Sequence, residues 1–479
     1  MSAPGSSASK NFPASTFSDA ASPTPKSRSL CHSECRAICG IRNLLFSFVG
    51  LLHNLRALNP SSPSEKLSPT LWTVLILLFL SLFISYIDRG ALSIAAPGLE
   101  REFSIPPSQL GILLSAFFWT YTPFLIFSGW LADRFSAAKI LAIGFAVWSA
   151  STFFTGFSRG FAVLLLCRLF LGVGESAAYP CFAGIVVQHF PARHRGFVNS
   201  FINTGVCAGP AFGLLLGGAL MQRYGWRSYF IALGAAGFLW IPFWLARMPR
   251  SSRYSLRAKE SESGPAASIA DILAHRSAWG TFLGHFGGNY FLYFLLTWLP
   301  YYLVHDRQFS LARMGKIGAL AYAFMAIVGL ASGFGSDRLI DHGRSVTVVR
   351  KSMIAGGQAV GGLALAACAL VGTGYAIPFL LFAAASYGFN ISNTWVIPQI
   401  LAGPRASGRW TGLQNFVGNL AGISAPVITG FLVQHTGSFA YAFLLAGLMS
   451  VLGAVSWLFL LGPLEEVSFR PINRPFPPS

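Results

Sequence analysis

The chain has 479 residues, of which 53% are hydrophobic and only 10% are charged, and phenylalanine alone occupies 43 positions. A soluble domain of this length would not have so apolar a composition, so the sequence indicates an integral membrane protein. The formal net charge is +18, but most of the excess falls in the N-terminal segment and in short loops, so we expect no nucleic-acid partner.

Residues 1–65 are rich in Ser, Ala and Pro and lack a long apolar run, which predicts a disordered N-terminal extension. Cys31, Cys35 and Cys39 lie in it without a second pair of ligands downstream, so we expect no metal site. Residues 41–56 could form an amphipathic helix on the membrane surface or belong to an organellar transit sequence. A start codon chosen too far upstream explains the extension equally well.

Twelve apolar stretches follow residue 70, and each has about the 20 residues that a membrane-spanning helix needs. They cover residues 71–96, 109–132, 139–158, 161–184, 197–221, 228–247, 279–304, 314–335, 347–372, 375–400, 409–433 and 438–462. The longest polar segment among them separates the sixth stretch from the seventh. We therefore predict an all-α integral membrane protein of twelve transmembrane helices. Its expected parts are two six-helix halves, 66–247 and 279–462, a cytoplasmic linker, 248–278, and a C-terminal tail, 463–479.

Lys and Arg residues give the expected orientation, because short cytoplasmic loops carry the excess of positive charge. The loops that follow even-numbered spans hold about sixteen Lys and Arg by our count, against about seven on the opposite side. We therefore expect both termini in the cytoplasm. The expected location is the inner membrane of the cell rather than an organellar membrane, and a monomer is expected to function.

Four charged residues interrupt otherwise apolar spans: Asp88 and Arg89 in the first, and Arg168 and Glu175 in the fourth. A charge at the bilayer centre costs about 3 kcal/mol or more, so such groups persist mainly where they pair or line a wet cavity. Arg168 and Glu175 are two helical turns apart and share a face with Tyr179, whereas the adjacent Asp88 and Arg89 point about 100° apart. These charges mark the candidate site. Static ion pairs that only hold helices together are the alternative.

The motif Gly-x-x-x-Asp-Arg stands after both the second and the eighth span. It comprises Gly129, Asp133 and Arg134 in the first copy and Gly333, Asp337 and Arg338 in the second. Equivalent loops that match 204 residues apart indicate an internal repeat. The chain here resembles the major facilitator superfamily, although Ser136 stands where that family usually has Gly. The resemblance implies two six-helix halves, a substrate site between them near the midplane, and a gating role for the motif.

The resemblance extends to the anion:cation symporter branch, which includes bacterial sugar-acid transporters and, more distantly, sialin and the vesicular glutamate transporters. Tyr86-x-Asp88-Arg89 in the first span and Arg168-x6-Glu175 in the fourth carry it. The resemblance implies that Arg89 is the main carboxylate ligand and that Arg168 is the switchable partner of Glu175. It also implies that Asp88 and Glu175 bind the coupling protons.

Other positions match the sugar-acid pattern more weakly. The candidate substrate ligands are Arg89, Arg168, Tyr86, Tyr121, Tyr179, Ser392, Thr394, Trp395 and Asn415. Hydroxyls, an amide and flat rings suit a polyol carboxylate.

Val206 stands where galactonate-type members have a Gln, which favours a substrate with fewer hydroxyls or one that binds differently. His285 could titrate near neutral pH, but a lone helix histidine is more often structural, so we expect proton coupling in the first half.

The sequence therefore predicts a proton-coupled symporter that imports an organic carboxylate, with a hexonate, hexuronate or aldarate as the first expectation, by alternating access. The expected partners are the anion, protons and the lipid bilayer, without a cofactor. An aromatic carboxylate, a dicarboxylate or phosphate stays open as the substrate. An enzyme is not expected, because the spans lack a Ser-His-Asp, HExxH or paired-Asp arrangement. Paired halves argue against a channel, and a non-transporting sensor of the same fold stays open.

Overall fold

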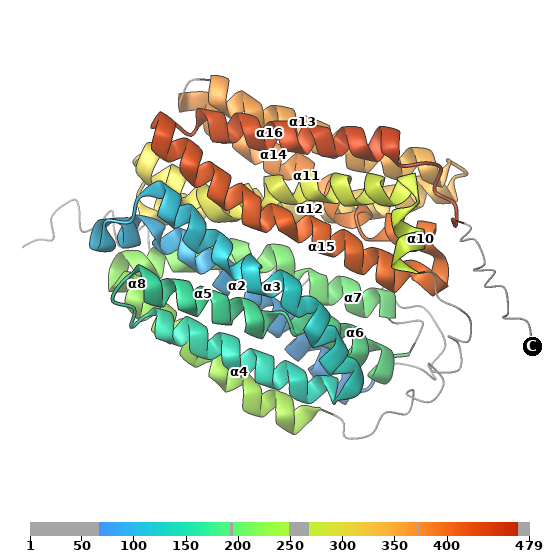
Figure 1. The fold of residues 1–479 in the computed structure, drawn as a ribbon, viewed down its shortest axis with the longest axis horizontal. Helices are drawn as coiled ribbons and strands as arrows, with labels where there is room; N and C mark the ends of the chain where they lie inside the picture. Colours follow the sequence, from blue (N-terminus) through green and yellow to red (C-terminus); the bar gives the residue numbers. More distant parts are fainter. Residues whose placement is uncertain (1–66, 192–194, 249–267, 372, 468–479) are drawn as a thin grey trace, which may run out of the picture. The chain divides into compact units, whose positions relative to one another are not determined.

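The computed structural model describes residues 67–191, 195–248, 268–371 and 373–467, and these residues are nearly all helical (Figure 1). The first half contains α2 (Pro69–Phe103), α3 (Pro107–Arg134), α4 (Ala137–Thr155), α5 (Phe161–Glu175), α6 (Ala178–His189), α7 (Arg195–Asn203) and α8 (Gly205–Arg247). The second half contains α10 (Ile269–Leu273), α11 (Arg276–Tyr301), η2 (Tyr302–Asp306), α12 (Leu311–Asp341), α13 (Val346–Leu370), α14 (Thr373–Asn393), α15 (Val396–Thr436), α16 (Ala440–Val455) and η3 (Ser456–Leu460). The predictions for residues 1–65, including Cys31, Cys35 and Cys39, lie outside the described residues.

Ten helical stretches in the described ranges are long and apolar enough to cross a membrane. One of them, Phe197–Arg247, contains two helices that meet at Gly225, where the backbone φ is 80°. α11 has 26 residues, which at 1.5 Å per residue gives about 39 Å, long enough to span the hydrocarbon core. With these two additions, the described residues form the twelve predicted spans, and the predicted fold class is confirmed.

Three spans are interrupted where the sequence predicted continuous helices, and one of them, the fifth, breaks at Thr204, between α7 and α8. The fourth breaks at Ser176 and Ala177, between α5 and α6, and the tenth breaks at Thr394 and Trp395, between α14 and α15. A proline follows the breaks in the fourth and tenth spans, Pro180 in the first half and Pro398 in the second. Proline has no N–H to donate to the carbonyl four residues earlier, which here belongs to Ser176 or Thr394. The freed Thr394 carbonyl instead accepts a hydrogen bond of 3.0 Å from Gln414 Nε2.

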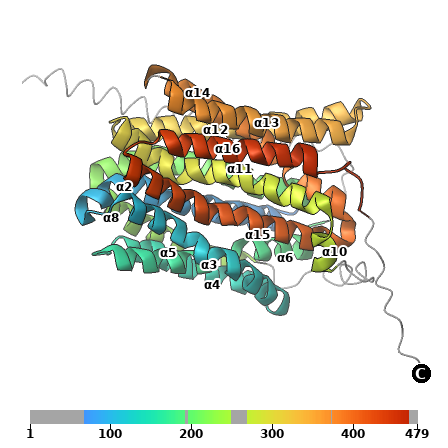
Figure 2. The same ribbon diagram turned by 45° about the horizontal axis from the view of Figure 1, so that its top comes forward.

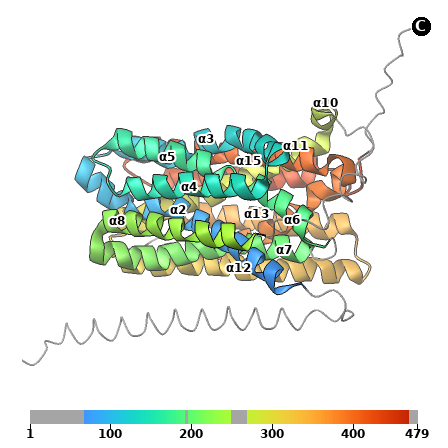
Figure 3. The same ribbon diagram turned by 90° about the horizontal axis from the view of Figure 1, so that it is seen from below.

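The two halves pack through three helix pairs, α2 with α11, α3 with α15, and α8 with α12 (Figures 2 and 3). We call the end of the bundle at which α2 ends the closed end. There the Ser93 hydroxyl donates to the Leu296 carbonyl at 2.9 Å, and the Tyr301 hydroxyl donates to Glu100 at 2.9 Å. Gly111 packs so closely on Pro426 that a Cβ would overlap the proline carbonyl.

At the other end of α3 and α15, which we call the open end, the helices leave space between elements. A Cβ built on Gly129, Gly408 or Gly412 would have no other element within 4 Å. Trp130 is 51% exposed there. The halves are therefore in close contact at the closed end and diverge toward the open end.

Candidate functional site

The centre of the first half holds a buried ion pair. Arg89 Nε on α2 lies 2.7 Å from Glu175 Oε2 at the end of α5, and both side chains are almost fully buried. The Ser85 hydroxyl, one turn before Arg89 on the same helix face, donates to the same Glu175 oxygen at 2.7 Å. The second carboxylate oxygen, Glu175 Oε1, is buried and has no hydrogen-bond partner among the described residues.

Three aromatic rings surround the Arg89 guanidinium. Its central carbon lies 4.7 Å from the ring centre of Tyr86, 4.7 Å from that of Phe117 and 4.6 Å from that of Tyr121. Cation–π contacts of this kind strengthen when water is excluded, and they favour the planar guanidinium over an ammonium. Tyr179, in the first turn of α6, lies within electrostatic reach of Tyr86, Tyr121 and Arg89.

Asp88 points away from this cluster, toward Thr152 on α4, and lies within electrostatic reach of Arg168 and Glu175. The Arg168 guanidinium carbon lies 5.6 Å from the Phe117 ring centre. Among the described residues, neither Asp88 Oδ1 nor Arg168 Nε has a hydrogen-bond partner. All four charges predicted from the sequence therefore gather in the core of one half.

The pairing within this group differs from the sequence prediction. Arg168 was expected to be the partner of Glu175, but in the structure Glu175 forms its ion pair with Arg89. The reason is geometric: Arg89 and Asp88 point in different directions from α2, and Arg89 is the one directed at the end of α5. Arg168 lies two turns before Glu175, on the side of Asp88 and Phe117.

Tyr293 on α11 connects this cluster to the second half. Its ring packs edge-on against Phe118 of α3 at 4.5 Å, and its hydroxyl donates to Asn419 Oδ1 at 2.8 Å. Asn419 Nδ2 in turn donates to Asn415 Oδ1 at 2.9 Å, so the predicted ligand Asn415 belongs to a polar chain that ends beside Arg89. Tyr293 also lies within electrostatic reach of Arg89.

The other predicted ligands of the second half lie at the break in the tenth span. The Thr394 hydroxyl is buried and donates to Asn390, at 2.6 Å to the side-chain oxygen, so it is already occupied. Trp395 is 36% exposed and packs edge-on against His285 at 5.1 Å. Ser392 lies near the end of α14, and its side chain is not described.

The two Gly-x-x-x-Asp-Arg motifs lie at the ends of α3 and α12, far along the helices from the ion pair. In the second copy, Asp337 accepts a hydrogen bond of 2.9 Å from Arg350 of α13. In the first copy, Arg134 lies against the Trp130 ring at 5.7 Å, whereas the Asp133 side chain is not described. Gly129, Gly333 and Arg338 lie in the last turns of the same two helices.

Ser85, Phe117 and Asn419 were missed by the sequence reasoning. Helical spacing could have identified the first two, because Ser85 is four residues before Arg89 and Phe117 is four residues before Tyr121. Asn419 had the same relation to the predicted Asn415. None of the three carries a charge, so none stood out from an apolar span.

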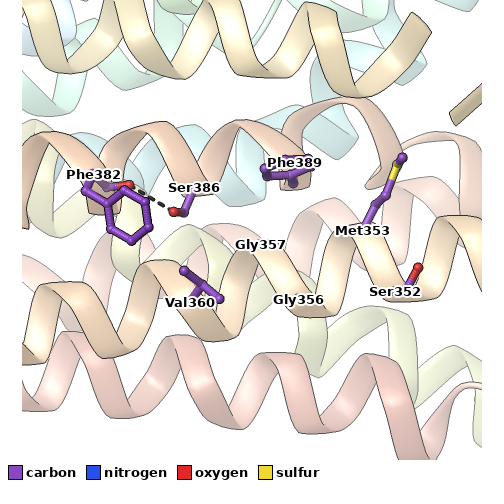
Figure 4. A pocket seen from close by; sticks show the side chains of 8 residues that line it. All are labelled: Ser352, Met353, Gly356, Gly357, Val360, Phe382, Ser386 and Phe389. Carbon is purple, nitrogen blue, oxygen red and sulfur yellow. Dashed lines mark hydrogen bonds between the residues drawn. The ribbon is translucent and has the colours of Figure 1, made fainter. Parts of the chain in front are cut away.

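A separate groove of about 370 Å³ lies between α13 and α14 (Figure 4). Val360, Phe382 and Phe389 line it, and its Ser386 hydroxyl is turned to its own helix, where it donates to the Phe382 carbonyl at 2.9 Å. Without a charged group the groove does not suit an anion.

In the part of the chain that the structure describes, no three His, Cys, Asp or Glu side chains come together as a metal site requires.

Comparison with known proteins places this geometry in a family. The sequence profile described as Major Facilitator Superfamily matches residues 78–426. A probable galactarate/D-glucarate transporter of Bacillus subtilis is 28% identical over 441 residues, which are 85% of this chain and 96% of the relative. A D-galactonate transporter of Escherichia coli is 29% identical and covers 83% of this chain and 96% of its own length. A probable chloroplastic anion transporter of Oryza sativa is 32% identical and covers 83% of this chain and 70% of its own length.

Solved structures support the same fold. The inward-open xylose transporter of E. coli aligns with a TM-score of 0.66 at 14% identity and covers 82% of this chain and 96% of its own. A bacterial homologue of the human lysosomal transporter Spinster aligns with a TM-score of 0.65 at 19% identity, covering 83% and 96%.

Proposed function

Because the chain belongs to the major facilitator superfamily, whose members are transporters and not enzymes, we propose that it is a proton-coupled symporter of a sugar-acid anion. Relatives named as transporters of galactarate and D-glucarate, of D-galactonate and of hexuronate support the substrate class. These anions share one or two carboxylates and several hydroxyls. The site offers an arginine for a carboxylate, and amides and tyrosines for hydroxyls.

The observation that carries the proposal is the Arg89–Glu175 pair. A substrate carboxylate that binds Arg89 would compete with the Glu175 carboxylate, because both draw on the charge and the N–H groups of one guanidinium. A proton on Glu175 removes its charge and weakens its hold on Arg89, and the unpartnered Glu175 Oε1 can take that proton without losing a hydrogen bond. Binding of a proton and of the anion are thereby coupled through one arginine.

Asp88 is the proposed second proton site. It points away from the aromatic rings, toward Thr152 and within electrostatic reach of Arg168, and its Oδ1 also has no partner among the described residues. Protonation of Asp88 would remove the negative charge of its carboxylate, so that the positive charge of Arg168 could balance a second negative charge on the substrate. Two protons with a monoanion would move one net positive charge inward per cycle, worth about 2.3 kcal/mol per 100 mV.

The proposed substrate site lies between the halves, near the membrane midplane. Arg89, Tyr86, Tyr121 and Tyr179 form its first-half side, and we assign Asn415, Trp395, Ser392 and Thr394 to the second-half side. Val206 on α8 supplies no hydrogen bond, so the hydroxyl contacts come from other elements.

Alternating access is the proposed transport cycle. The contacts of Ser93 and Tyr301 close one end in this structure, and the two Gly-x-x-x-Asp-Arg motifs at the other end are the proposed gate of the opposite state. The predicted orientation places the open end, both termini and the linker in the cytoplasm, with the transporter in the inner membrane and functional as a monomer.

The test is uptake of labelled galactarate, D-glucarate and D-galactonate into proteoliposomes with an imposed pH gradient. Uphill uptake should require the gradient. In Glu175→Gln, it should fall at least tenfold while exchange of internal for external substrate persists, because a neutral side chain mimics the protonated state. Glu102→Gln, which removes a surface ion pair with Arg227, is the matched control and should leave uptake unchanged.

Unchanged uphill uptake in Glu175→Gln would reject the proton site. Uptake of phosphate or an aromatic acid, without any sugar acid, would reject the substrate class and leave the transporter mechanism standing.

A further inference from the structure

A polar stripe runs along one face of α11. His285, Asn289 and Tyr293 are four residues apart, so they lie on the same face over about 12 Å. All three are buried, at 4%, 6% and 5% exposure. Tyr293, nearest the closed end, contacts Phe118 beside the arginine site. The stripe therefore begins at the arginine site and extends toward the open end.

His285 occupies the far end of the stripe with part of its hydrogen-bonding capacity unused. Its ring lies against Trp395, the Asn289 side chain and the Gln414 backbone. His285 Nδ1 and Gln414 Oε1 are both buried and have no hydrogen-bond partner among the described residues. A buried polar atom without a partner is costly, which points to a group that occupies this place in another state of the protein.

Trp395 and Gln414 connect His285 to the break in the tenth span. Gln414 donates its side-chain amide to the Thr394 carbonyl that the break leaves free, and its backbone lies against the His285 imidazole. Trp395, partly exposed, stands at the break itself. The site is thus assembled from two helices and an interruption, as ligand sites in broken helices are.

His285 is also distinctive in its chemistry. Among the described residues of the second half, it is the one buried histidine, and a ring N–H can donate a hydrogen bond to an anionic oxygen even when the ring is neutral. Asn289, one turn toward Tyr293, can donate two further hydrogen bonds. The pair is therefore suited to an anionic oxygen.

The distance along the helices fits a particular class of substrate. Ser93 on α2 lies level with Leu296 on α11, because they share a hydrogen bond. The Arg89 side chain reaches toward Ser85, with which it shares a Glu175 oxygen. Since α2 and α11 run in the same direction, its guanidinium is about 5 to 10 Å from the level of His285 along the bundle axis. The terminal carbons of an extended six-carbon diacid are about 6 Å apart.

We infer that His285, with Asn289, is a second anion subsite that binds the distal carboxylate of a six-carbon sugar diacid while Arg89 binds the first carboxylate. The inference rests on the proposed function and narrows its substrate class. Trp395 covers the carbon chain between the two ends. A sugar monoacid has a hydroxyl instead of a carboxylate at its distal end. Its contact with His285 therefore contributes less to its binding affinity.

The test compares a diacid with a monoacid in the same proteoliposomes. In His285→Gln, the KM for galactarate should rise about tenfold, while the KM for D-galactonate changes less than twofold. His189→Gln, at a buried histidine of α6 in the other half, is the matched control and should change neither. Equal changes for both acids, or no change for galactarate, would overturn the inference.

A second measurement needs no variant. The monomethyl ester of galactarate keeps the length and hydroxyls but carries one charge, so it should compete with galactarate about tenfold more weakly than galactarate itself in the wild-type protein. Equal competition would reject the second subsite. Wild-type transport of D-galactonate without galactarate would also reject it, yet would leave the proposed function intact, whereas transport of neither acid would reject the proposed function.

Discussion

The Arg89 guanidinium has more partners than any other charged group of the site described here. One carboxylate and three aromatic rings surround it, and each of these contacts uses the flat, delocalised shape of the group. A point charge on a flexible stem would satisfy the carboxylate but would not make the same contacts with the Phe117 and Tyr121 rings. The site therefore depends on the shape of this side chain as well as on its charge.

Arg89→Lys is expected to raise the KM for a sugar acid more than tenfold with the protein still folded. The charge is kept, so Glu175 is not left alone in the core, but a lysine cannot bind a carboxylate bidentately or keep the ring contacts of the planar guanidinium. Initial uptake rates over a range of substrate concentrations measure the effect. The surface substitution Arg227→Lys, at an exposed ion pair, should leave the KM unchanged, and an unaltered KM in Arg89→Lys would contradict the ligand role.

At this scale the sequence predicted which charges gather but not how they pair. The free-energy cost of a charge inside the bilayer identifies four residues as functional candidates before the fold is known: Asp88, Arg89, Arg168 and Glu175. The partner of Glu175 depends on the rotation of α2 against α5, which the positions of residues along the chain do not determine. The neutral members of the site, such as Ser85 and Phe117, gave no comparable signal because they are ordinary residues of apolar helices.

The interrupted spans are the main feature at the level of the elements. Each half has one in which a proline stands four residues after a carbonyl that thereby loses its helical partner. Glu175 lies directly before the first break, and Trp395 lies in the second. The interruptions thus place functional candidates from both halves where the regular pattern of helical hydrogen bonds is broken.

Pro398→Ala is expected to let the helix continue through Thr394, because the restored N–H can bond to its carbonyl. Thermal stability should rise, and transport should fall several-fold as Gln414 and Trp395 lose their present positions. Melting curves and uptake rates on the same preparation check both parts. Pro378→Ala, at a proline within α14, serves as the comparison, and a gain in stability with full transport would contradict the role of the break.

The sequence predicted the number and order of the spans well because twenty-residue apolar runs are set by the thickness of the bilayer. It did not predict the breaks, because the apolar runs continue through them. The ends of the spans also shifted: the first helix extends to Phe103, beyond the predicted residue 96, since its last turn is polar yet still helical. Hydropathy detects the membrane, whereas helix ends depend on local hydrogen bonds.

For the whole molecule, the contacts between the two halves determine which end of the helix bundle is closed. The hydrogen bond between Tyr301 and Glu100 and the close packing of Gly111 on Pro426 join the halves at the closed end. Helices that diverge elsewhere can approach only if these contacts separate. The balance between the two states therefore depends on a few polar groups together with close backbone packing.

Tyr301→Phe should shift this balance toward the state in which the closed end opens. Net hydrogen bonds to charged groups contribute about 1.5 to 3 kcal/mol, so a cysteine placed at Ser93 in a background without native cysteines should react at least tenfold faster with a thiol reagent. Tyr302→Phe, whose hydroxyl instead bonds to Arg307 within the second half, is the matched control. Equal labelling rates in the two variants would contradict a role for Tyr301 in closure.

The occupation of Arg89 by Glu175 has a consequence for the empty protein. The formal charges of Asp88, Arg89, Arg168 and Glu175 sum to zero, and in the proposed mechanism Glu175 occupies the arginine that a substrate carboxylate binds. In the proposed cycle, the transporter without substrate can therefore pass between its two states with balanced interior charge and return for the next cycle. If the protein bound an anion without a proton, its interior would carry a net negative charge. It would then not pass between its two states, and the anion would not cross the membrane without a proton.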